Sequence, residues 1–306
     1  MSMHTTIPIV FFGTGPVAAA SLERLHGSFT IEAVVTKPNP PHHKHAAPVI
    51  EVARQHGLPL LLAANKAELD TLIAAQRFTS RVAVLIDYGI IVSQAVIDTF
   101  PAGIVNSHFS LLPQWRGADP ITFAILSGQA QTGVSLMLLV QKMDEGPLLA
   151  RMTYDLPATI TTPELTDTLV AISASLLRDS LPQYLAGDLT PQPQGTDGVS
   201  YSRKLSKTDG LLDAAKPAIT LEREVRAFIG WPGSRLQLFG RDATVTRAHA
   251  AHYPPEPDHQ PGDISVSDDR TCIILHTSDG QLIIERLKPA GKKEMDAADF
   301  LRGVRI

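Results

Sequence analysis

The feature that most constrains the fold is the alternation of short apolar runs with helical segments over the first 110 residues. Each run has the length of a buried strand, and each helical segment has apolar residues at helical spacing. Strands that alternate with helices form a parallel sheet covered on both faces, so the pattern predicts an α/β domain with a mainly parallel sheet. The expected strands are residues 7–12, 31–36, 58–62, 81–86 and 103–106, and the expected helices are 17–25, 48–56, 68–75 and 94–100.

The pattern changes after a further expected strand at 132–140 and a long amphipathic helix at 163–186. Residues 188–199 contain two Pro and two Gly among polar residues, the composition of an exposed linker. We therefore predict a first domain at 1–188, a linker at 189–204 and a second domain at 205–306. The second domain is expected to be a small, mainly β barrel, with strands at 235–239, 244–248, 271–277 and 281–287.

Cysteine content and charge narrow the class of protein. Cys272 is the single cysteine, so neither an intrachain disulfide nor a thiolate metal cluster can form, and no metal site is expected. The amino-terminal residues show neither a signal sequence nor a membrane span, which predicts a cytoplasmic protein without a membrane partner. Residues 1–198 hold 11 Lys and Arg against 16 Asp and Glu, whereas residues 199–306 hold 16 against 15. Basic residues are thus more prominent in the second domain.

A glycine turn follows the first expected strand. Gly13-x-Gly15-x-x-Ala18 fits a loose dinucleotide fingerprint, in which backbone amides at a helix N-terminus hold a pyrophosphate. The second strand ends without the usual acidic residue, and Lys37 there could favour a 2′-phosphate, as in an NADP site. Pro16 lacks an amide hydrogen. A tight first turn of an α/β domain explains the same residues without a cofactor.

Three polar residues form the sharpest candidate site. Asn106 and His108 follow a buried strand and lie two residues apart, so their side chains point the same way if the strand continues. Asp144 follows the next expected strand. A histidine can move a proton, an asparagine amide can donate to an oxyanion, and an aspartate can orient the imidazole. These groups together favour acyl or formyl transfer to an amine without a covalent enzyme intermediate.

Several motifs, spread over nearly the whole chain, resemble the formyltransferases that use 10-formyltetrahydrofolate. The stretch NSHFSLLPQWRGADPI at 106–121 with Asp144-x-Gly146 is similar to the family's signature, and 87–91 is similar to its Tyr-Gly segment. Further similarities lie at 7–16, 132–135 and 201–206. The resemblance implies a Rossmann-like formyltransferase domain followed by a β-barrel domain similar to an oligonucleotide-binding (OB) fold.

The resemblance also implies roles for individual residues. Asn106, His108 and Asp144 occupy the catalytic positions. Residues 288–295 resemble family members whose acceptor is initiator methionyl-tRNA, which makes that tRNA the expected partner and 10-formyltetrahydrofolate the expected cosubstrate. The expected folate-lining residues are Tyr88, Gly89, Ile90, Ser110, Leu111, Leu112 and Pro113. The expected tRNA contacts are His42, His43, Lys44, Lys292 and Lys293.

The resulting expectation is a monomeric enzyme of translation initiation that transfers a formyl group from the folate to the α-amine of methionyl initiator tRNA. One alternative is a formyltransferase acting on a nucleotide-linked amino sugar, which would use the same three catalytic residues. A second is an NADP-dependent oxidoreductase built on the glycine turn, which leaves Asn106 and His108 unexplained. A third is a noncatalytic RNA-binding module, which the acidic first domain disfavours.

Overall fold

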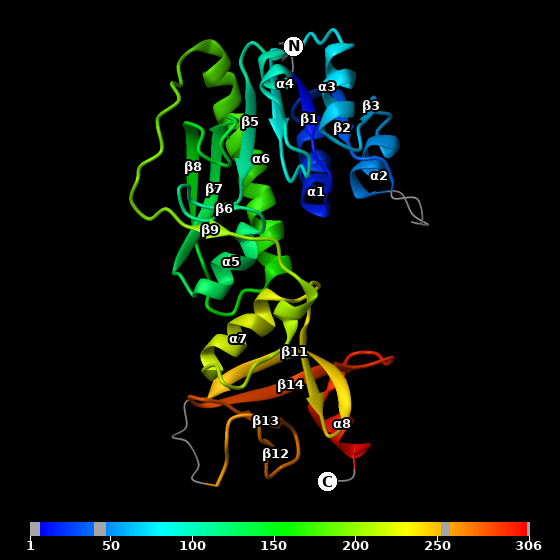
Figure 1. The fold of residues 1–306 in the computed structure, drawn as a ribbon, viewed down its shortest axis with the longest axis vertical. Helices are drawn as coiled ribbons and strands as arrows, with labels where there is room; N and C mark the ends of the chain where they lie inside the picture. Colours follow the sequence, from blue (N-terminus) through cyan, green and yellow to red (C-terminus); the bar gives the residue numbers. More distant parts are fainter. Residues whose placement is uncertain (1–6, 40–46, 252–257, 305–306) are drawn as a thin grey trace, which may run out of the picture. The chain divides into compact units, whose positions relative to one another are not determined.

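The chain forms two compact units in the computed structural model, which describes residues 7–39, 47–251 and 258–304 (Figure 1). The first unit ends at Ser202 and the second begins at Arg203, but the second unit also includes two earlier segments, Ile121–Ala130 and Leu156–Leu165. The predicted first domain ends at 188, and the predicted second domain begins at 205. These boundaries do not anticipate that the second unit takes two segments from the first part of the chain.

A seven-stranded sheet forms the centre of the first unit, with strand order β3-β2-β1-β4-β5-β7-β8. The five strands from β3 to β5 are parallel, as the alternating pattern predicts, whereas β7 and β8 run antiparallel. The mainly parallel Rossmann-like sheet is thereby confirmed. The strand bounds are Pro8–Phe12 (β1), Thr30–Thr36 (β2), Leu60–Leu62 (β3), Val82–Leu85 (β4), Ile104–His108 (β5), Gln131–Leu138 (β7) and Leu148–Asp155 (β8).

Up to residue 186, the helices begin and end close to the expected positions, except α5, which was not expected. α1 starts at Pro16, where a proline costs no hydrogen bond because the first amides of a helix have no partner within it. α3 is capped by Asn65, whose side chain accepts from the Glu68 amide. The bounds are Pro16–His26 (α1), Pro48–Gln55 (α2), Lys66–Ala74 (α3), Gln94–Asp98 (α4), Pro120–Ser127 (α5) and Thr162–Ala186 (α6).

The second unit contains an antiparallel sheet of order β10-β11-β14-β13-β12, with β15 paired to β14. Register shifts between β11 and β14 bend the two long strands, as bulges do, and the sheet forms a half-barrel consistent with the predicted OB-like fold. Helices α7 and α8 contribute Leu221, Val225 and Phe300 to its apolar core. The bounds are Lys207–Gly210 (η1), Ala218–Ala227 (α7), Ser234–Leu238 (β10), Arg241–Ala251 (β11), Ile264–Val266 (β12), Ile273–His276 (β13), Gln281–Pro289 (β14), Met295–Asp296 (β15) and Ala297–Arg302 (α8).

The segment before the second unit, residues 192–202, is bound to the first unit, and we call it the strap. At its start, Gln192 forms an antiparallel bridge with Leu148. At its end, β9 (Tyr201–Ser202) pairs in parallel with β6 (Arg116–Gly117). The Pro and Gly content of this segment predicts an exposed linker, but its hydrogen bonds attach it to the loop that follows β5.

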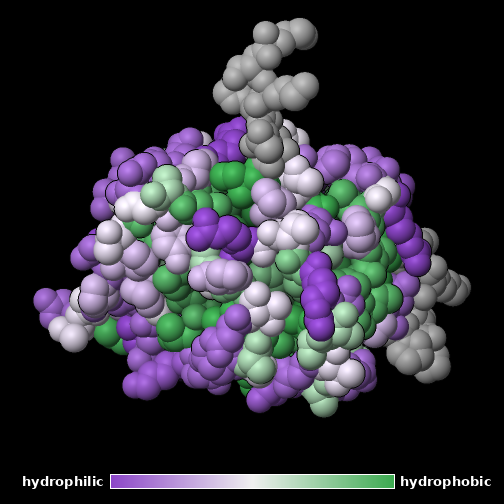
Figure 2. Space-filling view, turned by 90° about the horizontal axis from the view of Figure 1, so that it is seen from above, coloured by the Kyte–Doolittle hydropathy of each residue, from purple (hydrophilic) through white to green (hydrophobic). Residues whose placement is uncertain are grey.

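Within the described ranges, no helix is long and apolar enough to cross a membrane. The longest, α6, has 25 residues and contains Pro182, and it carries charged as well as apolar side chains. Figure 2 shows a face on which hydrophobic residues are interleaved with hydrophilic ones and surrounded by them. Such a mixed surface is ordinary for a folded chain.

Candidate active site

Strand β5 supplies two of the three predicted catalytic residues. It lies between β4, to which it is parallel, and β7, to which it is antiparallel. All five of its residues are buried, and Asn106 and His108 are only 7% and 6% exposed. Because β5 is a central strand whose backbone is bonded on both sides, these polar side chains are held in fixed positions near its carboxyl end.

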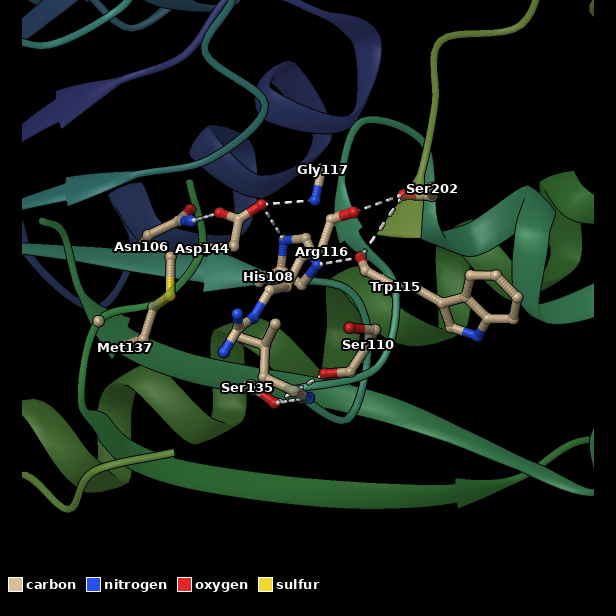
Figure 3. Close-up of polar contacts among 12 residues, drawn as sticks. Asn106, His108, Ser110, Trp115, Arg116, Gly117, Ser135, Met137, Asp144 and Ser202 are labelled. Atoms are coloured by element: carbon tan, nitrogen blue, oxygen red, sulfur yellow. Dashed lines mark hydrogen bonds and ion pairs between the residues drawn. The ribbon is translucent and has the colours of Figure 1, made fainter. Parts of the chain in front are cut away.

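The third residue, Asp144, reaches Asn106 and His108 from the turn between β7 and β8 (Figure 3). Its φ of 51° places it in the left-handed region, so the turn aims its carboxylate back at β5. Asn106 Nδ2 donates to Asp144 Oδ1 at 3.3 Å, and the Gly117 amide donates to Asp144 Oδ2 at 2.7 Å. The structure thus brings together the three residues that the sequence predicts would act together.

The hydrogen bonds of His108 fix the role of each ring nitrogen. Nε2 lies 2.8 Å from the carbonyl oxygen of Trp115, which can only accept, so Nε2 carries a hydrogen and donates it. Nδ1 lies 3.9 Å from Asp144 Oδ2. Nδ1 is therefore the ring nitrogen left to exchange a proton with a substrate, and it faces the Asp144 carboxylate.

The loop after β5 is held by side chains from β7 and β8. Ser135 Oγ accepts from the Leu112 amide at 3.0 Å and donates to the Ser110 carbonyl at 2.7 Å. Arg151 Nη1 donates to the Leu112 carbonyl at 3.1 Å. The loop that carries the Trp115 carbonyl and the Gly117 amide is thus fixed by the same sheet as Asn106 and His108.

The residues predicted to line a folate site lie on two segments at the carboxyl ends of β4 and β5. On the first, Tyr88 packs edge-on against Phe12 with ring centroids 5.5 Å apart, and Ile90 joins the apolar core. Burial raises the pKa of the Tyr88 hydroxyl above its ordinary value, and this buried hydroxyl has no hydrogen-bond partner in the described structure. A buried donor without a partner is costly, so Tyr88 is a group that a ligand could satisfy.

On the second segment, the side chains of Ser110 and Leu112 are fully buried. Ser110 Oγ donates to the Gln114 carbonyl, and Leu112 packs with Met137 and Leu148. Pro113 is buried as well, and Leu111 is half-buried. The buried side chains hold the shape of the loop, and its backbone groups and the side chain of Leu111 remain able to meet a ligand.

Asp87, a residue of the same chain, is hydrogen-bonded to the glycine turn. The Thr14 amide and Oγ1 both donate to the Asp87 carbonyl, at 3.0 and 2.8 Å. The Asp87 carboxyl accepts from the Ala18 amide, and it lies so close to Gly15 that a Cβ there would overlap it. Part of Asp87 remains exposed, but its carboxyl group is largely shielded from water. This shielding is the larger cause that raises the pKa of Asp87 to about 6, and the charge of the nearby Asp119 is the second. The amides expected to hold a pyrophosphate therefore already contact Asp87.

Lys37, the candidate for a 2′-phosphate contact, is also engaged. Its Nζ donates to the Gly89 carbonyl at 2.7 Å, and the Gly89 amide donates to Thr14 Oγ1 at 3.3 Å. These contacts tie residues 87–89 to the glycine turn. The turn acts here as a structural junction between β1, α1 and the segment after β4.

Two residues next to the turn that carries Asp144 have contacts that the sequence does not reveal. Arg116 is 8% exposed and donates through Nη2 to Gln194 Oε1 at 2.8 Å. Gln194, from the strap, donates to the carbonyls of Asp144 and Gly146. Arg116 falls inside the recognised motif, but Gln194 lies 50 residues after Asp144 in a segment without periodicity.

The residues predicted to contact tRNA fall in two places. Lys292 and Lys293 are exposed near β15, and Lys292 lines a cavity of about 520 Å³ with Arg241 and Phe300. The other three, His42, His43 and Lys44, lie outside the described residues. In the part of the chain that the structure describes, no group of three or more His, Cys, Asp or Glu residues could hold a metal ion.

This fold and this site define a formyltransferase. The family model for formyl transferases matches residues 7–180, and the model for the formyl transferase C-terminal domain matches residues 204–305, so the chain belongs to the formyl transferase family. Among curated proteins, the chain is 40% identical to a methionyl-tRNA formyltransferase of Halorhodospira halophila, covering 97% of this chain and 96% of the relative. It is 36% identical to a methionyl-tRNA formyltransferase of Roseiflexus castenholzii, covering 98% and 97%.

Solved structures share the fold at lower identity. An N-formyltransferase from Helicobacter canadensis, in complex with folinic acid and dTDP-3-aminofucose, matches with a TM-score of 0.67 and 16% identity, over 91% of this chain and 98% of that one. HypX from Aquifex aeolicus, in complex with tetrahydrofolic acid, matches with a TM-score of 0.62 and 16% identity, over 97% and 47%. These likenesses support the fold of the chain.

Proposed function

We propose that this chain is a methionyl-tRNA formyltransferase, which transfers the formyl group of 10-formyltetrahydrofolate to the α-amine of methionyl initiator tRNA. The observation that carries the proposal is the cluster in which Asn106 is hydrogen-bonded to Asp144 and His108 lies 3.9 Å from it, in a chain that matches methionyl-tRNA formyltransferases over nearly its full length. The cluster offers a donor, a proton acceptor and a carboxylate. Formyl transfer to an amine can use all three groups.

In the proposed reaction, the amine nitrogen forms a bond to the formyl carbon, and the formyl oxygen becomes an oxyanion. An amide nitrogen carries two N–H groups, and only one of those on Asn106 is needed for its bond to Asp144. The second can donate to the oxyanion. Because Asn106 is buried and already oriented, this donor needs little rearrangement as charge develops.

Collapse of the intermediate breaks the bond between the formyl carbon and N10 of the folate. The amine loses a proton and N10 gains one, so a group that can both take and give a proton balances the reaction. His108 Nδ1 suits this role because Nε2 is committed to the Trp115 carbonyl. Asp144 stabilises the protonated ring and holds it in orientation.

The wider assignment rests on the second unit and on the segments beside the site. We propose that 88–90 and 110–113 line the folate, and that Lys292 and Lys293, with His42, His43 and Lys44, contact the tRNA. The exposed lysines near the cavity by Phe300 support the phosphate contacts. We propose a cytoplasmic monomer, with a catalytic domain at 1–188, a linker at 189–204 and a tRNA-contacting domain at 205–306.

Two alternatives have less support. An amino-sugar formyltransferase would use the same catalytic cluster, but two solved sugar formyltransferases match at 16% and 17% identity, whereas the tRNA enzyme of Halorhodospira halophila matches at 40%. An NADP-dependent oxidoreductase would need the amides of the glycine turn, which already contact Asp87.

The decisive experiment compares two acceptors. Purified protein is supplied with 10-formyltetrahydrofolate and either methionyl initiator tRNA or a nucleotide-linked 4-amino sugar, and formylated product is measured by mass spectrometry. We expect formyl-methionyl-tRNA and no formylated sugar. Formylation of the sugar alone would refute the proposed acceptor, and formylation of neither would refute the proposed activity.

A further inference from the structure

Gln194 of the strap contacts the turn that carries Asp144 at two points. Its Nε2 donates to the Asp144 carbonyl at 2.7 Å and to the Gly146 carbonyl at 2.8 Å. It also lies 3.9 Å from Met137 Sδ on β7. One side-chain amide therefore binds the backbone on both sides of Glu145, and both of its hydrogens are used for this.

The oxygen of the same amide is fixed from the other side. Arg116 donates to Gln194 Oε1 through Nη2 at 2.8 Å and through Nε at 3.3 Å. Because Arg116 carries no acceptor, this contact determines which end of the Gln194 amide faces the turn. The amide nitrogen must point at the two carbonyls.

The turn needs such support because its backbone is unusual. Asp144 has a φ of 51°, and Gly146 is packed so closely against the Leu138 carbonyl that a Cβ there would overlap it. A non-glycine residue in the left-handed region is held there by its surroundings. The Gln194 bonds act on the Asp144 carbonyl, while the Asp144 carboxylate acts on Asn106 and Gly117.

We propose, resting on the proposed formyl transfer, that Gln194 is a positioning residue that fixes the Asp144 carboxylate against Asn106 and His108. It does not touch the reacting atoms. It acts through the backbone of the catalytic turn, and a small displacement of Asp144 would weaken the orientation of His108. Gln194 thus gives one residue of the strap a positioning role, in addition to the strap's connection to the second unit.

The test uses Gln194→Glu, which keeps the size of the side chain and an acceptor for Arg116 but removes both donors. Its carboxylate would face two carbonyl oxygens, and the repulsion between these negatively charged oxygens displaces the turn.

The matched control is Gln192→Glu, the same change two residues earlier, where the exposed side chain donates to the Thr190 carbonyl. We expect Gln194→Glu to lower kcat about 10- to 100-fold, the loss typical of a small misplacement of a catalytic group. The KM for methionyl-tRNA and the activity of the control should stay within about twofold, since neither variant alters a proposed tRNA contact.

A second measurement is independent of catalysis. The Gly117 amide donates to Asp144 Oδ2, so its hydrogen exchange reports the position of the carboxylate. We expect faster exchange at Gly117 in Gln194→Glu, with a melting temperature close to that of the wild type. Unchanged exchange and kcat would overturn the inference, as would a loss of activity matched by global unfolding. An inactive wild type in which Gln194→Glu still speeds exchange at Gly117 would refute the proposed function, while leaving the contact between Gln194 and the turn established.

Discussion

At the scale of single residues, the position of a side chain in the fold decides its chemistry. Asn106 and His108 are predictable from the sequence because alternate residues of a strand share a face. Asp144 is predictable as a residue of the turn after a neighbouring strand. The Trp115 carbonyl and the Gly117 amide are not, because a backbone group has no residue type to recognise. Gln194 is missed because its contacts join segments far apart in sequence.

Replacing Asn106 or His108 should affect the chemical step. We expect Asn106→Ala and His108→Ala each to lower kcat about 100- to 1000-fold, the loss typical of removing one donor to an oxyanion or one acid–base group. Single-turnover formylation assays measure this loss. Ser127→Ala, which removes a hydroxyl from the end of α5, is the control. Near-full activity in either catalytic variant would contradict the assignment of the cluster.

Asp87 gives a prediction about pH. Its pKa of about 6 lies above the value near 4 expected for an unfolded aspartate, so the folded state holds this proton more tightly. The contribution of Asp87 to stability is therefore present below about pH 4 and is lost as the pH rises through about 6. Asp87→Asn cannot ionise and keeps an oxygen for the Ala18 amide, so it avoids this loss.

We expect Asp87→Asn to gain stability relative to the wild type between pH 4 and pH 7, by at most about 1 kcal/mol because solvent screens a partly exposed carboxyl. Thermal melting of both proteins across this range measures the difference. Asp98→Asn, an exposed carboxylate on α4, serves as the control. A difference that is constant with pH would show that Asp87 titrates as it does in the unfolded chain.

At the scale of elements, strand and helix positions in the first unit follow from hydrophobic spacing, but strand direction does not. β7 pairs antiparallel with β5, and no period of the sequence encodes this direction. β8, α5 and α7 are not predicted either, since β8 is buried only at its start and α5 is nearly uniformly apolar. The pairing of β6 with β9 joins two-residue strands, too short to carry a pattern.

Gly117 tests the pairing of these short strands. Its φ is 104°, and a Cβ there would lie 2.5 Å from the Ser202 carbonyl oxygen, so Gly117→Ala strains the backbone and separates β6 from β9. We expect a loss of about 1–3 kcal/mol in the free energy of unfolding, together with reduced kcat, because the Gly117 amide also binds Asp144. Urea unfolding and formylation assays measure both effects.

The control for Gly117→Ala is Gly195→Ala in the strap, where a Cβ would meet no atom within 4 Å and the backbone is not left-handed. This variant should match the wild type in stability and rate. If Gly117→Ala also matched it, β6 and β9 would not be coupled to the catalytic turn.

At the scale of the whole molecule, charge is distributed unevenly along the chain, and the net value of −4 hides this. If Lys292 and Lys293 contact phosphates, removing both should reduce the dependence of tRNA affinity on salt. We expect the slope of log Kd against log salt to fall by about 2 in the double alanine variant, about 1 for each contact. Lys66→Ala on α3 is a control in the first unit and should leave the slope unchanged. An unchanged slope in the double variant would remove both lysines from the tRNA interface.

The division of the chain between its two units restricts how the protein can be dissected. The second unit includes Ile121–Ala130 and Leu156–Leu165, and the first retains residues up to Ser202. A fragment cut at 188 would keep all three catalytic side chains but lose Gln194 and β9, and one starting at 203 would expose surfaces that the two earlier segments cover. Neither half is thus a transferable module, so acceptor specificity cannot be exchanged between relatives by joining halves at one site. In a working chimaera, the strap would have to match the first unit, and the segments Ile121–Ala130 and Leu156–Leu165 would have to match the second.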